Sequence, residues 1–398
     1  MKQTNHRPTA LPTCSLVVTT IGRGEFLSDY FDAVRRERAL ERVDVIVIPD
    51  RRTPAELYER CGAFARKGLR VECPTVEEQD AYLAHRGLSG FVPYNSDNRR
   101  NIGYLMALER GSAFVVSIDD DNYCRPGEDF FAEHAVVCAE RTDGVCVNTP
   151  ERFFNICDLM EVDRPAIYPR GYPYRHRHGP VRVTRTQDAG PVRLNAGLWL
   201  NEPDLDAMTW LVAGPVRATG FKGESVLLGD RAWTPINTQN TALHRDVVAA
   251  YYFARMGYPL AAGMSIDRYG DILSGYFVQA CVRHLGHRIR VGTPLADHRR
   301  NTHNYMRDAT HEMGCVWLIE DLADWLVELK LQGSTYHETY LSLAAELDDA
   351  AERFTGFIWT DATRGYIHQT AWCMRRWANA CAAVKGGAAD EEAAVLAA

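Results

Sequence analysis

The chain has 398 residues, of which 46% are apolar and 24% are charged. A chain of this length and composition can bury a large core, which excludes a collagen, a coiled coil or a largely disordered protein. The formal net charge of −7 argues against a dedicated nucleic-acid-binding protein, because such proteins carry a basic excess.

The sequence also bears on membranes and on the redox compartment. No apolar run approaches the roughly 18 residues of a membrane span, so we expect no membrane partner. The polar N-terminal segment has no apolar stretch typical of a signal peptide. Eleven cysteines form no Cys-x-x-Cys pair and no cluster at zinc spacing. They are expected to be small buried side chains in a reducing compartment, which predicts a cytoplasmic protein.

Predicted strands and helices alternate in the first third of the chain. Strands are expected at 16–20, 43–48 and 113–118, and helices at 26–34 and 102–111. Apolar strands that alternate with helices are typical of an α/β fold, in which a mostly parallel sheet is covered by helices on both faces.

Polar side chains stand where these predicted strands end. Thr20 ends the first strand, Asp50 follows the second, and Asp119, Asp120 and Asp121 end the third. Ligands of such sheets bind beyond the carboxyl ends of the strands. We therefore expect these side chains to converge on one site.

The rest of the chain divides into further segments. Residues 148–193 are rich in Pro, Arg, His and Tyr and are expected to form long loops, which in compact domains are often functional. Helices are expected at 240–256 and 272–285. Beyond 308 the apolar residues recur at helical spacing, which predicts helices with one apolar face. Such apolar faces could also support the formation of a homo-oligomer. The predicted organisation is an N-terminal tail at 1–14, an α/β catalytic domain at 15–308, a helical region at 309–385 and a disordered tail at 386–398.

The acidic triplet predicts a cation site. Adjacent carboxylates raise one another's pKa unless a cation neutralises them, and oxygen ligands suit Mg²⁺ or Mn²⁺. Asp119 and Asp121 point to the same side of an extended segment and are expected to bind one ion. Asp120 points the other way, toward a ribose or sugar hydroxyl. An ion on two carboxylates keeps positions for the phosphates of a departing nucleoside diphosphate. The alternative is a solvated acidic turn or a helix cap.

Other nucleotide motifs are absent or weak. The sequence has no Gly-x-x-x-x-Gly-Lys-Ser/Thr loop and no Gly-x-Gly-x-x-Gly after a strand, which argues against P-loop and dinucleotide chemistry. Gly22-Arg23-Gly24 is either a tight turn or a place where Arg23 contacts a phosphate. The cationic segment 175–178 is either a diphosphate neighbour or a solvated surface cluster.

Several blocks resemble a known family. A strand that ends in Asp-x-Asp resembles the Rossmann-related GT-A fold of nucleotide-sugar glycosyltransferases. More specifically, the chain resembles the reversibly glycosylated polypeptides, which are the UDP-arabinopyranose mutases. The matching blocks follow in the same order and are Ser-Ile-Asp-Asp-Asp (117–121), Pro-Arg-Gly-Tyr-Pro-Tyr (169–174), Gly-Leu-Trp-Leu-Asn-Glu-Pro-Asp (197–204), Ile-Asp-Arg-Tyr-Gly-Asp (266–271) and Gly-Thr-Pro-Leu-Ala-Asp-His (292–298).

The resemblance implies a GT-A-like sheet flanked by helices, a manganese-dependent UDP-sugar site and a C-terminal helical appendage. Arg170 matches the arginine that becomes reversibly glycosylated in that family, although a guanidinium is by its chemistry a better phosphate clamp than nucleophile. The resemblance also implies that His298 is a third metal ligand and that Asp50 and Arg100 contact the nucleotide. Asp271 is implied to lie on the acceptor or sugar face, and Asp267 is the alternative residue for that role.

The chain departs from the family pattern at Asn122, Ala196 and Gly270, which surround the sugar side. The first hypothesis is therefore a metal-dependent glycosyltransferase that uses a UDP-type donor and a small-molecule or protein acceptor. The alternative is a mutase that glycosylates itself on an arginine. A non-catalytic nucleotide-sugar-binding protein ranks last, because the catalytic positions are retained. Trp199 and Tyr172 are expected to be packing aromatics rather than sugar platforms.

Overall fold

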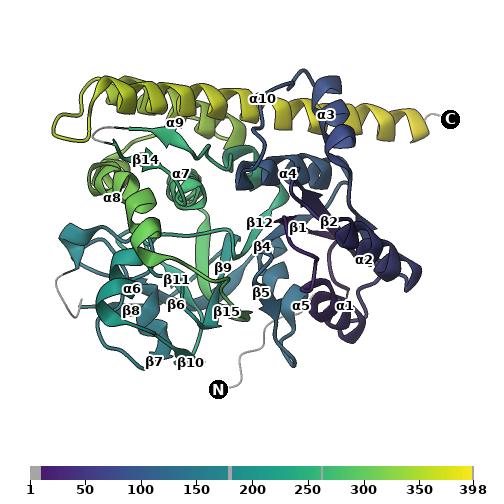
Figure 1. Ribbon diagram of the computed structural model, residues 1–398, viewed down its shortest axis with the longest axis horizontal. Helices are drawn as coiled ribbons and strands as arrows, with labels where there is room; N and C mark the ends of the chain where they lie inside the picture. The colour runs from purple at the N-terminus through teal and green to yellow at the C-terminus, as the bar shows by residue number, and fades with distance from the viewer. Residues whose placement is uncertain (1–9, 178–181, 261–262, 397–398) are drawn as a thin grey trace.

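The computed structural model describes residues 10–177, 182–260 and 263–396. Within these residues the central feature is a 13-stranded mixed sheet (Figure 1). Its main path has the order β3-β2-β1-β4-β12-β9-β15-β11-β6-β8. In that order the strands are Arg70–Glu72, Val43–Pro49, Cys14–Thr20, Phe114–Asp119, Asn240–His244, Val192–Asn201, Arg288–His298, Val226–Leu228, Thr142–Asn148 and Thr184–Gly190. Off this path lie β5 (Asn122–Cys124), β7 (Met160–Val162) and β10 (Ala218–Phe221), and a separate two-stranded sheet contains β13 (Tyr258–Pro259) and β14 (Ser265–Ile266).

The first four strands on the path, β3, β2, β1 and β4, are all parallel. β12 runs antiparallel to β4 and to β9, and β15 runs parallel to β9. The two reversals at β12 cancel, so β1, β4, β9 and β15 all run in one direction. Their carboxyl ends therefore meet at one edge of the sheet, which positions the site described below.

Side-chain alternation gives the sheet two apolar faces. Along β1, Leu16 and Val18 pack on one face in a core shared with α1 (Leu27–Arg36), α2 (Ala55–Arg66) and α5 (Phe130–His134). Val17 points to the opposite face, in a core shared with α3 (Val76–His85), α4 (Arg100–Glu109) and α7 (Gly270–His284). Consecutive residues of a strand face opposite ways, so one apolar run serves both cores.

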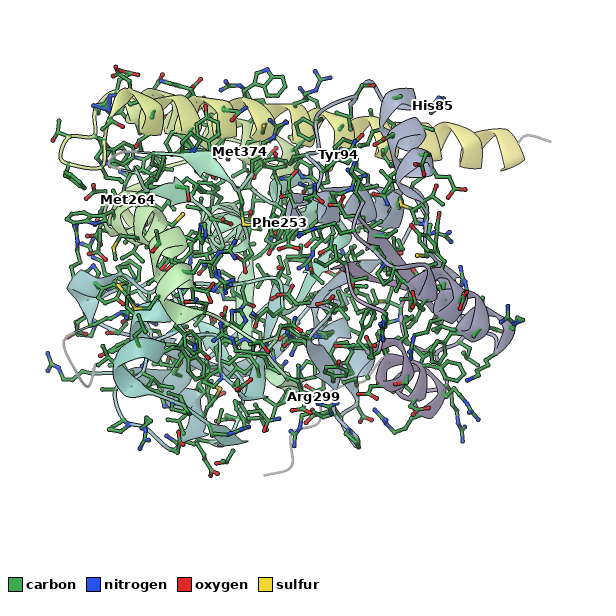
Figure 2. The ribbon with its side chains drawn as sticks, in the orientation of Figure 1. His85, Tyr94, Phe253, Met264, Arg299 and Met374 are labelled. Carbon is green, nitrogen blue, oxygen red and sulfur yellow. The ribbon has the colours of Figure 1, made fainter. Side chains whose placement is uncertain are left out.

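The C-terminal region is helical, as predicted. It contains α8 (Tyr305–Glu328), α9 (Tyr336–Ala351) and α10 (Asp361–Leu396), and α10 crosses the whole molecule in Figure 1. Met374 (Figure 2) lies on α10 and is buried in the core that contains α4 and α7. Trp377 on the same helix is buried in that core as well. The region is thus packed onto the sheet domain, and α10 extends through most of the segment 386–398. Residues 1–9 of the expected tail 1–14 lie outside the described residues, and β1 begins at Cys14.

The sequence interpretation was wrong at 240–256. That segment is β12 followed by a 3₁₀ turn, Arg245–Ala250, and an irregular stretch. Its apolar residues are buried on both faces of the sheet, and a short run of this kind has the same periodicity in a strand as in a helix. The expected loops at 148–193 also contain β7 and β8. The helix expected at 272–285 is confirmed as α7.

Several other expectations are confirmed. The α/β class, with helices on both faces and a helical C-terminal region, is observed. Trp199 and Tyr172 are buried packing residues. All eleven cysteines are free, and Cys73 and Cys138 alone are not fully buried.

Among the described helices, none combines the length and apolar character needed to cross a membrane. The remaining helix, α6, spans Ala207–Ala213.

Candidate functional site

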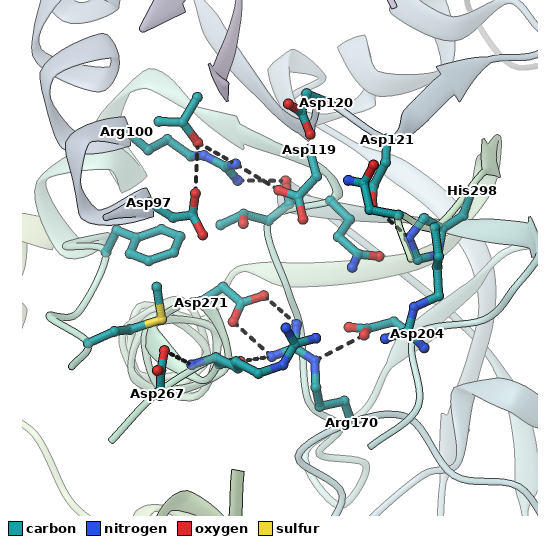
Figure 3. A pocket seen from close by; sticks show the side chains of 18 of the residues that line it. Asp97, Arg100, Asp119, Asp120, Asp121, Arg170, Asp204, Asp267, Asp271 and His298 are labelled. Carbon is teal, nitrogen blue, oxygen red and sulfur yellow. Dashed lines mark hydrogen bonds and ion pairs between the residues drawn. The ribbon is translucent and has the colours of Figure 1, made fainter. Parts of the chain in front are cut away.

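A polar cavity of about 340 Å³ opens at the carboxyl ends of β1, β4, β9 and β15. Figure 3 shows the acidic triplet and His298 along one side, with Arg170, Asp271 and Asp267 across from them. Thr19, Asp119 and His298 come from the last residues of three of these strands. Of the side chains expected to converge at the strand ends, the acidic triplet lines the cavity, whereas Thr20 and Asp50 do not.

Asp119 is paired with an arginine. Arg100 Nη2 donates to Asp119 Oδ1 at 2.7 Å and to Thr19 Oγ1 at 3.0 Å, and Arg100 Nη1 donates to the Thr238 carbonyl at 3.4 Å. Burial raises the pKa of Asp119 to about 7; Arg100 opposes that shift, and Asp121 adds to it. Arg100, which was expected to contact the nucleotide, therefore holds Asp119 in the cavity wall.

Asp120 turns away from its two neighbours. Its Oδ2 accepts a 2.5 Å hydrogen bond from Thr20 Oγ1, and Thr20 Oγ1 in turn accepts from the Gly22 amide at 2.8 Å. Burial raises the pKa of Asp120 to about 6, although the Thr20 hydrogen bond lowers it. Asp120 therefore fixes the turn after β1. It also lines the cavity, and it lies with Asp121 in the turn after β4 rather than in the extended segment that was predicted.

Asp121 faces His298 because of strand pairing. β5 follows the triplet and pairs with the end of β15, with Asn122 opposite His298. His298 Nδ1 lies 2.5 Å from the Glu202 carbonyl, and Nε2 lies 3.6 Å from Asp121 Oδ2. Burial would lower the pKa of His298, but Asp121 raises it; His298 likewise outweighs burial and lowers the pKa of Asp121.

The three predicted metal ligands are not gathered around one point. Among the described residues, no group of three or more His, Cys, Asp or Glu side chains is placed to hold a metal ion. The reason is that Asp119 is committed to Arg100. Asp121 and His298 nevertheless fit Mn²⁺ or Mg²⁺ as a two-residue site. The Nδ1 contact to a carbonyl is the usual support of a metal-binding histidine, and such ions take remaining ligands from substrate phosphates.

Arg170 lies on the opposite wall and is surrounded by acceptors. Its Nε donates to Asp204 Oδ1 at 2.9 Å, and its two Nη atoms donate to the two oxygens of Asp271 at 3.2 and 2.9 Å. It also donates to the Arg268 carbonyl. Burial would lower the pKa of Arg170, but Asp204 and Asp271 raise it well above its usual value. Arg170 is therefore a fixed cation with its charge compensated.

The local chain allows this placement. Gly171 has φ +87°, and a Cβ there would clash with Ile272 Cγ2 on α7. A side chain at this position would therefore push the loop away from α7. The Arg-Gly step brings Arg170 against Asp271, which lies in the first turn of α7.

Asp271 and Asp267 differ in their surroundings. Asp271 is buried and both its oxygens accept from Arg170, so it is not a helix cap; α7 has no side-chain cap at Tyr269. Asp267 is half-buried, lines the cavity, and lies 3.3 Å from His311 Nδ1. Asp267 is the more accessible of these two carboxylates.

Three predicted nucleotide contacts, Arg23, Asp50 and Thr20, do not line the cavity. Arg23 is exposed on the turn after β1. Asp50 is buried, and its two oxygens accept from the amides of Arg51 and Ser96. Asp50 therefore ties the end of β2 to the segment before α4. Thr20, from the same set of predictions, is engaged by Asp120.

The cationic segment 175–178 is neutralised by other helices. Arg175 pairs with Glu320, Asp321 and Asp324 on α8, His176 pairs with Asp324, and Arg177 pairs with Asp206 at the start of α6. His178 lies outside the described residues. These side chains anchor the Arg170 loop to the helical region.

The cavity residues that the sequence interpretation missed include Asp97, Asp204, Phe253 and Arg300. Asp204 follows the end of β9 and Arg300 follows the end of β15. A polar residue directly after an apolar strand is the same signal that identified the acidic triplet in the sequence. Asp97 and Phe253 carry no such signal. Asp97 lies in the 3₁₀ turn before α4, where Asp97 Oδ1 accepts from Thr19 Oγ1 at 3.4 Å.

Comparisons with known proteins show a family match. The model of the family described as "Reversibly glycosylated polypeptide" matches residues 15–385. The chain is 26% identical over 257 residues to a "Probable UDP-arabinopyranose mutase 4" of Arabidopsis thaliana, covering 64% of this chain and 65% of that protein. It is 27% identical over 259 residues to a "Probable UDP-arabinopyranose mutase 1" of Solanum tuberosum, with the same two coverages. The match thus spans about 65% of the length of these relatives.

Solved structures show a more distant likeness. S. aureus TarS in complex with UDP-GlcNAc is 13% identical, with 95% of this chain and 92% of that chain covered and a TM-score of 0.39. Glucosyl-3-phosphoglycerate synthase of Mycobacterium tuberculosis in complex with Mn²⁺ and UDP-glucose is 11% identical, with coverages of 77% and 79% and a TM-score of 0.36.

Proposed function

Because this chain belongs to the reversibly glycosylated polypeptide family, we propose that it cleaves the bond between the sugar and the diphosphate of a UDP-sugar and transfers the sugar to an acceptor hydroxyl. One observation carries the proposal: Asp121 and His298 face the Arg170–Asp204–Asp271 cluster across a single polar cavity. Such a cavity offers a diphosphate site on one wall and hydroxyl-binding groups on the other.

The reaction breaks the bond between the anomeric carbon and the phosphate oxygen and forms a bond from that carbon to the acceptor oxygen. The acceptor proton goes to a carboxylate or to water, and UDP leaves with the bonding electrons. A divalent cation bound by Asp121 and His298 would neutralise the growing charge on the diphosphate. The Arg100 ion pair keeps Asp119 in place beside that site.

The sugar side is assigned to the opposite wall. Arg170 is held by two carboxylates, and its raised pKa keeps it cationic. A protonated guanidinium is a poor nucleophile, so the geometry favours an electrostatic and positioning role for Arg170. Asp267, the more accessible carboxylate, is the candidate for orienting sugar or acceptor hydroxyls.

A second candidate is a nucleotide-sugar mutase that forms a transient adduct on Arg170. It is supported by the relatives named UDP-arabinopyranose mutase and by the position of Arg170 in the cavity wall. In this case the protein itself is the acceptor, and the sugar returns to UDP with a different ring size.

The experiment is incubation of the purified protein with a panel of UDP-sugars and Mn²⁺, with UDP release, protein labelling and nucleotide-sugar ring form measured in parallel. UDP release that depends on an added acceptor supports the transferase. Labelled protein with a changed ring form supports the mutase. Binding of UDP-sugar without either outcome contradicts both and leaves the non-catalytic binding protein.

We also propose a cellular compartment and self-association for this protein. A reducing, cytoplasmic compartment is supported by the eleven free cysteines. Self-association through the C-terminal helical region is supported by exposed aromatic side chains, namely Trp317 on α8, Trp372 on α10 and Phe357 in the turn between α9 and α10.

A further inference from the structure

The arginines that line the cavity differ in whether their charge is already neutralised. Within the described residues, the lining contains Arg100, Arg170, Arg268 and Arg300. Arg100 pairs with Asp119, and Arg170 pairs with Asp204 and Asp271.

Arg268 is the third neutralised arginine. Its Nε lies 3.1 Å from Glu312 Oε1, and its Nη1 lies 3.7 Å from Asp308 Oδ1. Arg300 is different, because no described carboxylate lies within ion-pair distance of its side chain. Arg300 Nη1 is buried and has no hydrogen-bond acceptor.

An unpaired, buried N–H group on a cation is costly to leave without a partner. The Arg300 guanidinium is nevertheless held in place, with its central carbon 5.0 Å from the ring centre of Trp210 and 5.7 Å from that of Tyr305. The Arg300 amide donates to Glu202 Oε2 at 3.1 Å. The side chain is therefore positioned by rings that leave its donors unused.

The backbone places Arg300 beside the predicted cation site. His298 is the last residue of β15, and the amide of Arg299 donates to the carbonyl of Asp121 at 2.9 Å. Arg300 thus follows directly after a residue bonded to the acidic triplet. Among the described arginines that line the cavity, Arg300 is the one without an ion-paired carboxylate, and it lies where an oxyanion near Asp121 and His298 could accept its hydrogen bonds.

We propose that Arg300 binds the diphosphate of the nucleotide-sugar, in the place that Arg170 and Arg23 were expected to take. This inference rests on the proposed function for the identity of the nucleotide. The ligand chemistry it requires is a pyrophosphate group, whose oxygens accept the planar fork of N–H donors that a guanidinium offers.

The chain offers a matched control in the adjacent residue. Arg299 is exposed (Figure 2). It pairs with Asp297 at 2.7 Å and lies 4.2 Å over the ring of Tyr123. It does not line the cavity. Arg299→Gln and Arg300→Gln therefore remove the same charge one residue apart, and only Arg300→Gln removes it from the cavity.

The test is isothermal titration of UDP, uridine and inorganic pyrophosphate, with Mn²⁺ present and ionic strength fixed. We expect Arg300→Gln to weaken UDP binding by about 10- to 100-fold, the loss typical of a charge-assisted contact. Uridine affinity should stay unchanged, Arg299→Gln should bind UDP like the wild type, and Arg300→Lys should lie between. If Arg300→Gln does not fold, Arg300→Lys carries the test, because it keeps the charge and loses the fork.

The outcomes separate this inference from the proposed function. Equal UDP affinity in wild type and the Arg300 variants overturns the inference and leaves UDP binding standing. Equal losses in Arg299→Gln and Arg300→Gln also overturn it, because the effect is then general electrostatics. Pyrophosphate binding that needs Arg300, without binding of UDP, overturns the nucleotide assignment and supports the inference. Absence of binding by any probe to the wild type overturns both.

Discussion

Asp204 provides the sharpest test of how the cavity wall is held together. Its Oδ1 accepts from Arg170 Nε at 2.9 Å and its Oδ2 accepts from Asn237 Nδ2 at 2.8 Å. An asparagine has one side-chain oxygen and one amide nitrogen. In Asp204→Asn, the amide therefore faces a donor, whichever way it is turned, and one buried hydrogen bond is lost together with the charge.

The magnitude follows from the pKa of this carboxyl. Burial would raise the pKa of Asp204, but the charge and hydrogen bond of Arg170, with that of Asn237, lower it to about 2. Relative to an unfolded value of about 3.9, this corresponds to about 2–3 kcal/mol of stability. Because the folded pKa is the lower one, that stability is present above about pH 4. It is lost as the pH falls through about 2.

The assay is urea unfolding of wild type and Asp204→Asn at a series of pH values. We expect the variant to be less stable by about 2–3 kcal/mol at pH 7, with a gap that narrows below about pH 4. Asp143→Asn is the control, since Asp143 is exposed and pairs with an exposed Arg141, and such pairs contribute little. A variant no less stable than this control at pH 7, or a gap as wide in acid as at neutrality, refutes the reasoning.

Three further predictions concern the cavity and the helical region. Arg170→Lys should lower donor turnover by about 100-fold, because one ammonium cannot replace the fork between two carboxylates; wild-type rates would make Arg170 a loop residue only. Asp121→Asn should abolish metal-stimulated UDP release, and excess chelator should lower the wild type to the same level; full activity in either case contradicts the metal site. Trp377→Ala should cost about 3–5 kcal/mol in thermal unfolding, because Trp377 is fully buried and Nε1 donates to the Val248 carbonyl; an unchanged midpoint contradicts the docking of α10.

The sequence alone located the acidic wall of the cavity. Asp119 ends an apolar strand, Asp120 and Asp121 form the turn after it, and all three line the cavity. Their place could be predicted because ligands of a parallel sheet bind beyond the carboxyl ends of its strands. The family motifs likewise marked Arg170, Asp271 and His298, which all line the cavity.

The charge state of each side chain was decided by tertiary contacts. Arg170 was expected to face phosphates, yet Asp204 and Asp271, 34 and 101 residues away in the chain, surround it. Arg300 carried no motif, and its availability depends on its guanidinium having no ion pair with any described carboxylate. Whether a cation is compensated is a property of its neighbours in space. The same holds for 240–256, where residues 240–244 form a strand because β4 and β9 lie on either side of it. The periodicity of apolar residues in a sequence indicates which residues are buried. It does not show whether a short buried segment is a strand or a helix, because that depends on the strands that lie beside it in the assembled sheet.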